Sequence, residues 1–473
     1  MSNILCVDLD GTLLNTDSLH EAIFCFIKKN PLRIFWLFFW LSQGRAYLKQ
    51  KIAQYTQLDV SHLPYNQEVL TWIKEAKAQG QKLVLVTAAH ISIAEKVAAH
   101  LGLFDEVLAS RDGMNLKSHV KASTLNQHYG RKQYDYMGNS HADVAVWQEA
   151  DQAILVNTSS RLLRKVSRNI SVSKVIPRQK LSMRAWFKAI RVHQYAKNIL
   201  VFIPLLASHA IINAPAILHT VLGFICFSLT ASSVYLLNDL LDLKEDRAHP
   251  TKSKRAIASG MLSIPKASML SLACLTIAIS ASFFLPPAFQ AVLAIYYVLT
   301  LAYSFQLKQI VLVDVIVLSI LYTLRIVAGI ALLVEVTYSP WLLLFSMLFF
   351  LSLAFLKRVS ELHLLDKKGH KQLLGRNYHT IDLLVFATFG IVSGFMSILV
   401  FTLYLSSDVA IRLYHHPQLL LLIYPFMLYW LCRIWLLAMQ GKVHDDPVLH
   451  ALRDKTSYYI GIIILIILSV ATV

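Results

Sequence analysis

The chain has 473 residues, of which 56% are hydrophobic and only 15% are charged, and its formal net charge is +17. This balance excludes an ordinary soluble globular protein. The five cysteines are scattered without a CxxC or Cys/His cluster, which argues against a disulfide framework and a zinc site. Most of the excess Lys and Arg lies in a linker and between apolar runs, so the charge indicates membrane topology and not nucleic-acid binding.

The first residues predict a buried strand that ends in two carboxylates. Ile4–Val7 is apolar, and Asp8 and Asp10 follow it at positions i and i+2, which leave a strand end on the same side. Gly11 permits a sharp turn directly after them. This pattern indicates a polar site at the carboxyl end of the first strand.

Further polar residues follow two later strands of the same region. A strand over residues 82–86 ends at Thr87, Lys121 comes next in the chain, and a third strand end carries Asn139 and Asp143. Helical stretches separate these strands, so we expect a doubly wound α/β fold. Ligands bind at the carboxyl ends of the strands in such sheets, which predicts that these side chains gather there.

The order of these motifs resembles the haloacid-dehalogenase (HAD) superfamily of phosphatases. The resemblance implies an α/β HAD-like, Rossmannoid domain with a helical cap, one bound Mg²⁺, and hydrolysis of a phosphate monoester. Carried over residue by residue, it implies these roles: nucleophile Asp8, acid/base Asp10, phosphoryl contacts Thr87 and Lys121, and metal ligands Asp8, Asp10, Asp143 and Asn139. Many relatives carry Asp where this chain has Asn139, so we expect weaker metal affinity. A phosphatase kept only as a scaffold is the alternative.

The segment from about residue 17 to 65 stands where these relatives insert a helical cap. Within it, residues 31–41 are almost entirely apolar but too few to span a bilayer. We expect a cap helix that rests on the membrane surface or on the second domain. An ordinary buried cap core is the alternative. The predicted domain boundaries are 1–157 for the phosphatase domain, 158–198 for a basic linker with an interfacial helix, and 199–473 for the membrane domain.

The membrane domain is predicted to be an all-α bundle of about nine transmembrane helices. The apolar runs lie near residues 199–215, 217–237, 265–285, 288–304, 311–334, 340–356, 382–405, 418–438 and 456–473. Loops dense in Lys and Arg alternate with short uncharged ones, which places the dense loops and the N-terminal domain in the cytoplasm and the C-terminus outside. The start of the chain has no basic n-region, so we read no signal peptide and expect a multi-pass protein of the inner (plasma) membrane.

A polar stretch, residues 238–246, follows the second apolar run directly. If the helix continues through it, Asn238, Asp242 and Asp246 fall on one stripe, with Asp239 beside Asp242. Carboxylates crowded at a membrane boundary repel one another unless a hard cation lies between them, and oxygen ligands suit Mg²⁺ that bridges to a diphosphate. A solvated, charged helix end is the alternative.

The helical bundle with this Asn-Asp-x-x-Asp-x-x-x-Asp string resembles the UbiA superfamily of intramembrane transferases, and most closely the branch of decaprenyl-phosphate phosphoribosyltransferases. The resemblance implies that Asp239, Asp242 and Asp246 are catalytic and hold one or two Mg²⁺ ions. It also implies a set of polar and basic substrate contacts: Asn238, Lys252, Arg255, Tyr303, Lys308, Lys357, Arg358, Arg376 and Lys197. For several of the basic residues, a role in setting topology alone stays open.

These features predict a bifunctional membrane enzyme. It would transfer 5-phosphoribose from phosphoribosyl diphosphate to a polyprenyl phosphate, and the HAD domain would then remove the 5-phosphate. An alternative function is a UbiA-type prenyltransferase that moves a prenyl group from a prenyl diphosphate to an aromatic or other small acceptor, with a scaffold or independent phosphatase head. The lack of a second Asp-rich motif argues against this alternative. A second alternative is a transporter or channel with a regulatory head.

Overall fold

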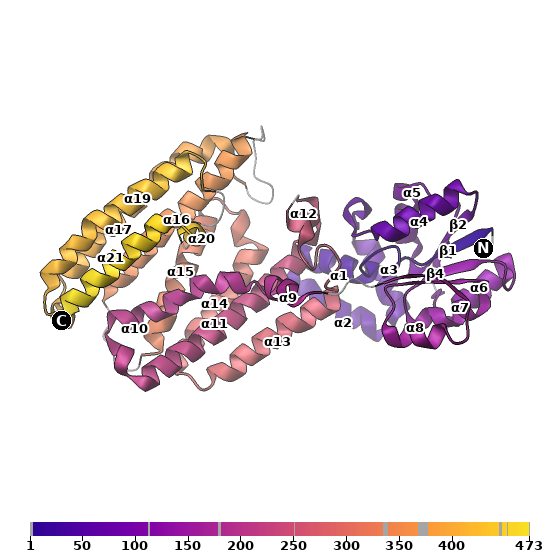
Figure 1. Cartoon of the computed structure of the whole chain (residues 1–473), viewed down its shortest axis with the longest axis horizontal. Helices are drawn as coiled ribbons and strands as arrows, with labels where there is room; N and C mark the ends of the chain where they lie inside the picture. Colours follow the sequence, from indigo (N-terminus) through magenta and orange to yellow (C-terminus); the bar gives the residue numbers. More distant parts are fainter. Residues whose placement is uncertain are drawn as a thin grey trace. The chain divides into compact units, whose positions relative to one another are not determined.

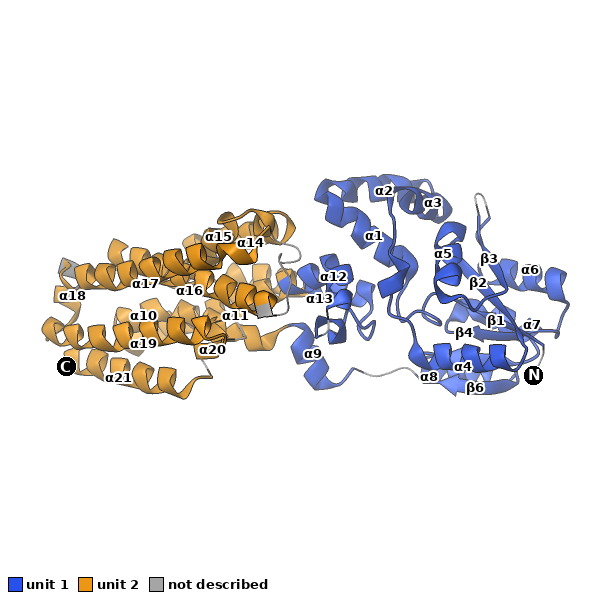
Figure 2. Ribbon diagram, turned by 90° about the horizontal axis from the view of Figure 1, so that it is seen from above, with its two compact units in different colours: residues 1–190, 235–271 blue, residues 191–234, 272–473 orange. Residues whose placement is uncertain are grey.

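The computed structural model describes residues 3–111, 114–177, 181–249, 251–333, 339–367, 377–443, 447–451 and 453–472. The chain forms two compact units (Figure 2). Unit 1 comprises residues 1–190 and 235–271, and unit 2 comprises residues 191–234 and 272–473. The α/β domain therefore shares its unit with the segment that follows the second predicted span.

Unit 1 is built on a six-stranded parallel sheet in the order β3-β2-β1-β4-β5-β6. The strands are β1 (Ile4–Val7), β2 (Lys82–His90), β3 (Glu106–Ser110), β4 (Asp135–Gly138), β5 (Ala153–Val156) and β6 (Val172–Ile176). Alternate side chains of a strand point to opposite faces of the sheet. In β1, Leu5 and Val7 belong to one buried cluster, and Cys6 belongs to the other. The helices along the sheet are α4 (Gln67–Ala78), α5 (Ile91–Leu101), α6 (His119–Tyr129), α7 (Val144–Glu149) and α8 (Ser160–Val166). The predicted α/β fold is confirmed.

The sheet extends beyond the boundary expected at residue 157. Strand β6 pairs with β5, and the predicted linker also contains α8 and α9 (Met183–Ala189). Within β6 only Ile176 is fully buried, and Ser173 and Lys174 are exposed. An edge strand of this kind lacks a continuous apolar run, so the sequence does not distinguish it from a linker.

Three helices form the cap: α1 (Ser18–Lys29), α2 (Ile34–Ser42) and α3 (Arg45–Tyr55). Their shared core includes Phe26, Trp40 and Ile52. Trp40 is the one buried residue of α2, whereas Phe35 and Phe38 are both 66% exposed. The alternative of a buried cap core therefore fails for α2, and its apolar surface remains available to a membrane.

Among the described residues, eight helices are long and apolar enough to cross a membrane, not the nine expected. The spans are residues 214–241, 264–282, 287–305, 313–331, 340–366, 380–405, 417–439 and 455–472 (Figure 1). The predicted span at 199–215 is not one helix, because a 3₁₀ segment (Val192–Phe202) gives way to the short helix α10 (Ile203–Ala207). Pro204 stands in the first turn of α10, where its missing N–H is tolerated, and it prevents a longer helix from running through this point.

Candidate active sites

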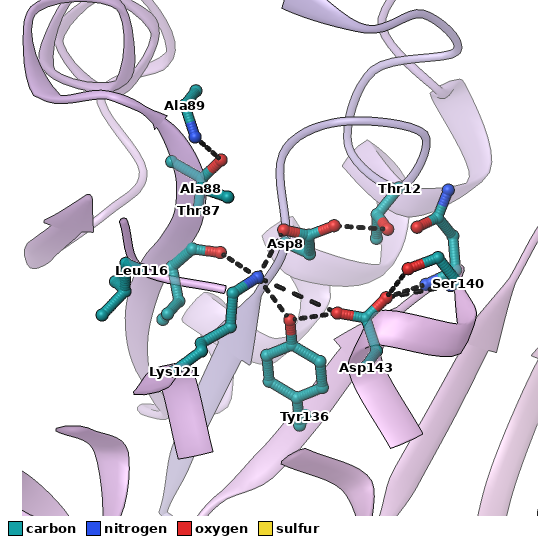
Figure 3. A network of polar contacts seen from close by, with 12 residues as sticks. Asp8, Thr12, Thr87, Ala88, Ala89, Leu116, Lys121, Tyr136, Ser140 and Asp143 are labelled. Carbon is teal, nitrogen blue, oxygen red and sulfur yellow. Dashed lines mark hydrogen bonds and ion pairs between the residues drawn. The ribbon is translucent and has the colours of Figure 1, made fainter. Parts of the chain in front are cut away.

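The first site lies where β1 and β4 end. Asp8 follows β1, Asp143 follows β4, and Lys121 reaches them from α6 (Figure 3). The Lys121 Nζ donates to Asp8 Oδ1 at 2.8 Å and lies 3.8 Å from Asp143 Oδ1. All three side chains are at most 10% exposed. The structure thus brings the predicted nucleophile, cation and late carboxylate into one buried network.

Hydrogen bonds fix Asp143 in this network. Its Oδ1 accepts from the Tyr136 hydroxyl at 2.9 Å, and that hydroxyl accepts from Lys121 Nζ at 2.9 Å (Figure 3). Its Oδ2 accepts from the Ser140 hydroxyl at 2.9 Å and from two backbone N–H groups. Tyr136 and Ser140 carried no role in the sequence analysis. The available signal for Tyr136 was strand alternation, which puts it on the same side of β4 as Gly138.

Burial raises the pKa of two predicted catalytic carboxyl groups, Asp8 and Asp10. Burial raises the pKa of Asp8 to about 6, although the Lys121 ammonium counteracts part of this effect. Burial also raises the pKa of Asp10 to about 8, and repulsion from Asp17 adds to the rise. At neutral pH Asp10 therefore retains its proton, which is the form that a general acid requires.

Asp10 is oriented by the cap, and Gly11 is required beside it. The Asp10 Oδ1 accepts from the backbone N–H of Ser18, the first residue of α1, at 2.7 Å. Gly11 has φ +77°, and a Cβ there would lie 1.9 Å from the Asn139 side-chain nitrogen. Glycine adopts this left-handed conformation without strain, and its lack of a Cβ leaves room for the Asn139 side chain. Asn139 is thereby held against the loop that carries Asp10.

Thr87 lines the same cavity as Asp8 and Asp10, a space of about 280 Å³. It is fully buried, and its Oγ1 accepts from the Ala89 backbone N–H at 3.0 Å. The structure thus places every predicted phosphatase residue around one cavity, with Lys121 and Asn139 also among its walls.

The donor set of this cavity fits Mg²⁺. Asp8 and Asp143 approach one cation, Lys121, and carboxylate, amide and carbonyl oxygens are the ligands that Mg²⁺ prefers. The Asp8 Oδ2 has only a long contact of 3.5 Å with the Thr12 hydroxyl. In the described ranges, no group of three or more His, Cys, Asp or Glu side chains is gathered as a metal site. The fit therefore rests on two carboxylates together with oxygens of other types.

The second site carries the acidic motif, and its helix is interrupted there. Helix α11 (Ala214–Leu241) ends directly before Asp242, which caps α12 (Leu243–Ala248). The backbone still bonds from Asp242 N to Asn238 O at 2.9 Å and from Asp246 N to Asp242 O at 2.8 Å. The helix therefore does not continue unbroken through residues 238–246, which was the condition for placing Asn238, Asp242 and Asp246 on one stripe.

Carboxylates from the two sides of the interruption meet at one cation. Asp239 and Asp246 converge on Arg255 Nη1, at 3.0 and 2.6 Å. Asp242 instead lies 3.3 Å from Lys28 Nζ of the cap. Asp239 and Asp246 are close enough to share a cation, as joint Mg²⁺ ligation requires. Arg255, a predicted phosphate contact, is engaged by the carboxylates themselves.

A buried charge network occupies the core of unit 2. Arg358 is fully buried; its Nε bonds Asp314 Oδ2 at 2.6 Å, and its Nη1 bonds Glu361 at 2.6 Å. Tyr303 donates to Asp314 Oδ1 at 2.6 Å, and Tyr378 donates to Asp314 Oδ2 at 3.0 Å. The sequence analysis assigned no role to Asp314, the acceptor at the centre of this network. Arg358 and Tyr303, both predicted as substrate contacts, are held by it.

The remaining predicted contacts are distributed over both units. Lys197 is buried, with its Nζ 5.6 Å from the centre of the Tyr322 ring. Asn238 and Lys252 belong to unit 1, Lys308 and Lys357 belong to unit 2, and Arg376 lies outside the described residues. The structure therefore gathers the predicted phosphatase residues around one cavity, and the predicted membrane-site residues belong partly to unit 1 and partly to unit 2.

Unit 1 also joins the cap to the segment that carries the acidic motif. Glu21 of α1 and Arg247 of α12 form a doubly bonded ion pair at 2.6 and 3.0 Å, with side chains 3% and 7% exposed. A second cavity of about 520 Å³ shares Asp10 and Asn139 with the first. Residues 259–261 and 263–266 also line it. One cavity thus has walls from both the polar groups at the sheet edge and the loop around Gly260.

A buried Asp–Lys–Asp network at the end of a parallel sheet, under a helical cap, defines a HAD-type phosphohydrolase domain. Two family models match the chain: haloacid dehalogenase-like hydrolase over residues 5–147, and UbiA prenyltransferase family over residues 199–452. The chain belongs to the UbiA prenyltransferase family, and it is an enzyme that joins a transferase domain of this family to a HAD hydrolase domain. With its eight candidate spans, it is a multi-pass membrane protein.

Relatives match nearly the whole chain or a part of it. Uncharacterized protein y4nM of Sinorhizobium fredii is 37% identical over 97% of this chain and 89% of its own length. Decaprenyl-phosphate phosphoribosyltransferase of Corynebacterium glutamicum is 35% identical over 39% of this chain and 56% of its own length. A solved UbiA homolog from Archaeoglobus fulgidus, bound to GPP and Mg²⁺, has a TM-score of 0.47 and 15% identity, and the match covers 60% of this chain and 97% of that one.

Proposed function

We propose that the membrane domain transfers 5-phosphoribose from phosphoribosyl diphosphate to a polyprenyl phosphate. The convergence of Asp239 and Asp246 on one cation supports a diphosphate-binding role for the acidic motif. The similarity to a decaprenyl-phosphate phosphoribosyltransferase supports the choice of substrates. In the reaction, the bond between the ribose anomeric carbon and the diphosphate breaks, and an oxygen of the lipid phosphate forms the new bond to that carbon. Asp239, Asp242 and Asp246 would hold Mg²⁺, which would offset the charge of the leaving diphosphate.

The HAD domain would then remove the 5-phosphate. The Asp8 carboxylate attacks phosphorus while protonated Asp10 gives its proton to the leaving ribose oxygen, and water hydrolyses the resulting acyl phosphate. Lys121 neutralises charge beside Asp8, and Thr87 contacts a phosphoryl oxygen. Asp8, Asp143, Asn139 and the Asp10 carbonyl would hold Mg²⁺, which would screen the phosphoryl oxygens.

Coupling of the two steps is supported by unit 1 itself. The buried Glu21–Arg247 pair fixes the cap to the segment with the acidic motif, and the second cavity borders both Asp10 and the loop around Gly260. A phosphorylated lipid released near this loop would meet the phosphatase at high effective concentration. We place the protein in the inner membrane, with the phosphatase domain in the cytoplasm and the C-terminus outside.

Membranes that contain the protein, supplied with labelled phosphoribosyl diphosphate, polyprenyl phosphate and Mg²⁺, test this function. We expect a labelled lipid without a monoester phosphate from the wild type, and a labelled lipid that keeps it from Asp8→Asn. Absence of any labelled lipid would refute the transferase assignment. A wild-type lipid that never loses its monoester phosphate would refute the coupling.

A further inference from the structure

The phosphatase cavity contains two lysines that neither the network around Asp8 nor the proposed chemistry uses. Lys49 comes from the cap helix α3, and Lys117 comes from the loop before α6. Both line the cavity of about 280 Å³ that also contains Asp8. Lys121, by contrast, is committed to Asp8 and Asp143 at the bottom of the site. The cavity therefore has cations beyond those needed for the reacting phosphoryl group.

Lys49 is held in place by packing and by neutral acceptors. Its neighbour Leu48 packs in the cap core with Phe26, which fixes the face of α3. The Lys49 Nζ donates to the carbonyl of Ala88 at 2.7 Å and to the side chain of Asn115 at 3.5 Å. In the described part of the chain, no carboxylate lies within ion-pair distance of this ammonium.

A partly buried cation without a counter-charge is costly unless a ligand supplies the anion. Burial lowers the pKa of Lys49; the more distant carboxylates of Asp10 and Asp17 counteract part of this effect, and repulsion from Lys117 and Lys121 adds to it. The contact with Asn115 ties Lys49 to the loop that carries Lys117, two residues later in the chain. Both lysines line the same cavity, and lysine binds phosphate oxygens as a compact point charge.

We infer that Lys49 and Lys117 form a second anion subsite of the phosphatase, which binds a phosphodiester carried by the same molecule as the scissile monoester. This inference rests on the proposed phosphatase activity and deepens it. The preferred substrate class is a sugar phosphate that carries a second phosphate group on another carbon of the same sugar. A ribosyl lipid phosphodiester that still carries its 5-phosphate belongs to that class.

Two soluble substrates test the subsite with the full-length protein and Mg²⁺: ribose 5-phosphate, and ribose 5-phosphate with a methyl phosphodiester at C1. Both have one hydrolysable monoester, and only the second has the additional anion. We expect the wild type to favour the diester-bearing substrate by about tenfold or more in kcat/KM, the scale of a charge-assisted contact. Lys49→Met and Lys117→Met should each reduce this preference by about three- to tenfold, and Lys49→Arg should retain most of it.

Lys51→Met is the matched control, because Lys51 lies on the same helix and its Nζ contacts the exposed Gln54 and the Tyr47 ring. It should leave the preference at the wild-type value. Equal losses on both substrates in Lys49→Met would show a purely structural lysine and overturn the inference. A wild-type preference near one would overturn it as well.

Binding separates this inference from the rest of the proposed function. Calorimetry on Asp8→Asn protein with the diester-bearing substrate should show tighter binding than with ribose 5-phosphate, and adding Lys49→Met should remove the difference. Equal binding of the two compounds, or none, overturns the subsite whether or not turnover is seen. A clear preference without any labelled lipid in the membrane assay would retain the subsite and refute only the transferase.

Discussion

The two acidic sites of this protein are assembled in different ways. In the phosphatase, Asp8 and Asp143 are far apart in the sequence, yet neighbouring parallel strands bring them to the same lysine. In the membrane motif, Asp239, Asp242 and Asp246 are close in sequence, and Asp239 and Asp246 meet at Arg255, whereas Asp242, at the break between the two helices, pairs with Lys28. In this protein, the order of parallel strands predicts which aspartates meet more dependably than their spacing along a helix does.

The sharpest test of this comparison is loss of the nucleophile. Asp8→Asn should reduce Mg²⁺-dependent phosphate release from ribose 5-phosphate by about a thousandfold or more, because the covalent step has no substitute. Lipid labelling by the same preparation should continue, which controls for folding. Undiminished phosphate release would contradict the assignment of Asp8.

The divided motif predicts unequal roles for its carboxylates. Asp239→Asn and Asp246→Asn should each reduce lipid labelling by about a hundredfold or more, since each removes half of a shared cation site. Asp242→Asn should cost less, about tenfold, because its carboxylate pairs with Lys28. Initial rates with labelled phosphoribosyl diphosphate measure this order.

Glu245→Gln supplies the control for that series, because Glu245 also pairs with Lys28 but is 54% exposed. Its labelling rate should stay near the wild-type value. Equal losses for Asp239, Asp242 and Asp246 would favour the single stripe that the sequence predicts over the divided arrangement.

The network around Asp314 is expected to govern stability. Arg358→Met leaves Asp314 as a buried charge that has lost its bidentate partner, which should lower the free energy of unfolding by about 3–5 kcal/mol. Thermal unfolding in detergent would reveal the loss. The double variant Arg358→Met with Asp314→Asn should recover part of it, whereas a phosphate-binding Arg358 would show reduced labelling at unchanged stability.

The smallest expected effect concerns the apolar surface of α2. Trp36 is 51% exposed and Phe39 is 62% exposed, so contact with a bilayer would bury both. In nanodiscs with brominated lipids, we expect the quenching of tryptophan fluorescence to fall modestly in Trp36→Tyr. The control Trp147→Tyr changes a tryptophan within the sheet core and should leave the quenching of Trp36 in place. Identical quenching in wild type and Trp36→Tyr would contradict membrane contact by α2.

The sequence by itself determined the α/β domain, the helical membrane domain and the meeting of the predicted phosphatase side chains around one cavity. Strand ends of a parallel sheet meet at one edge, so the positions of Asp8, Thr87 and Asp143 along the chain were enough to predict that they meet. Apolar runs likewise indicate spans, although the 3₁₀ geometry before Pro204 reduced nine expected spans to eight among the described residues.

Only the tertiary structure decided which partner each charge receives. The pairing of Asp242 with Lys28, the ion pair of Arg358 with Asp314, and the Tyr136 bridge all join residues from different elements. A charge in a sequence has many possible partners, and packing selects one because burial penalises every unpaired alternative.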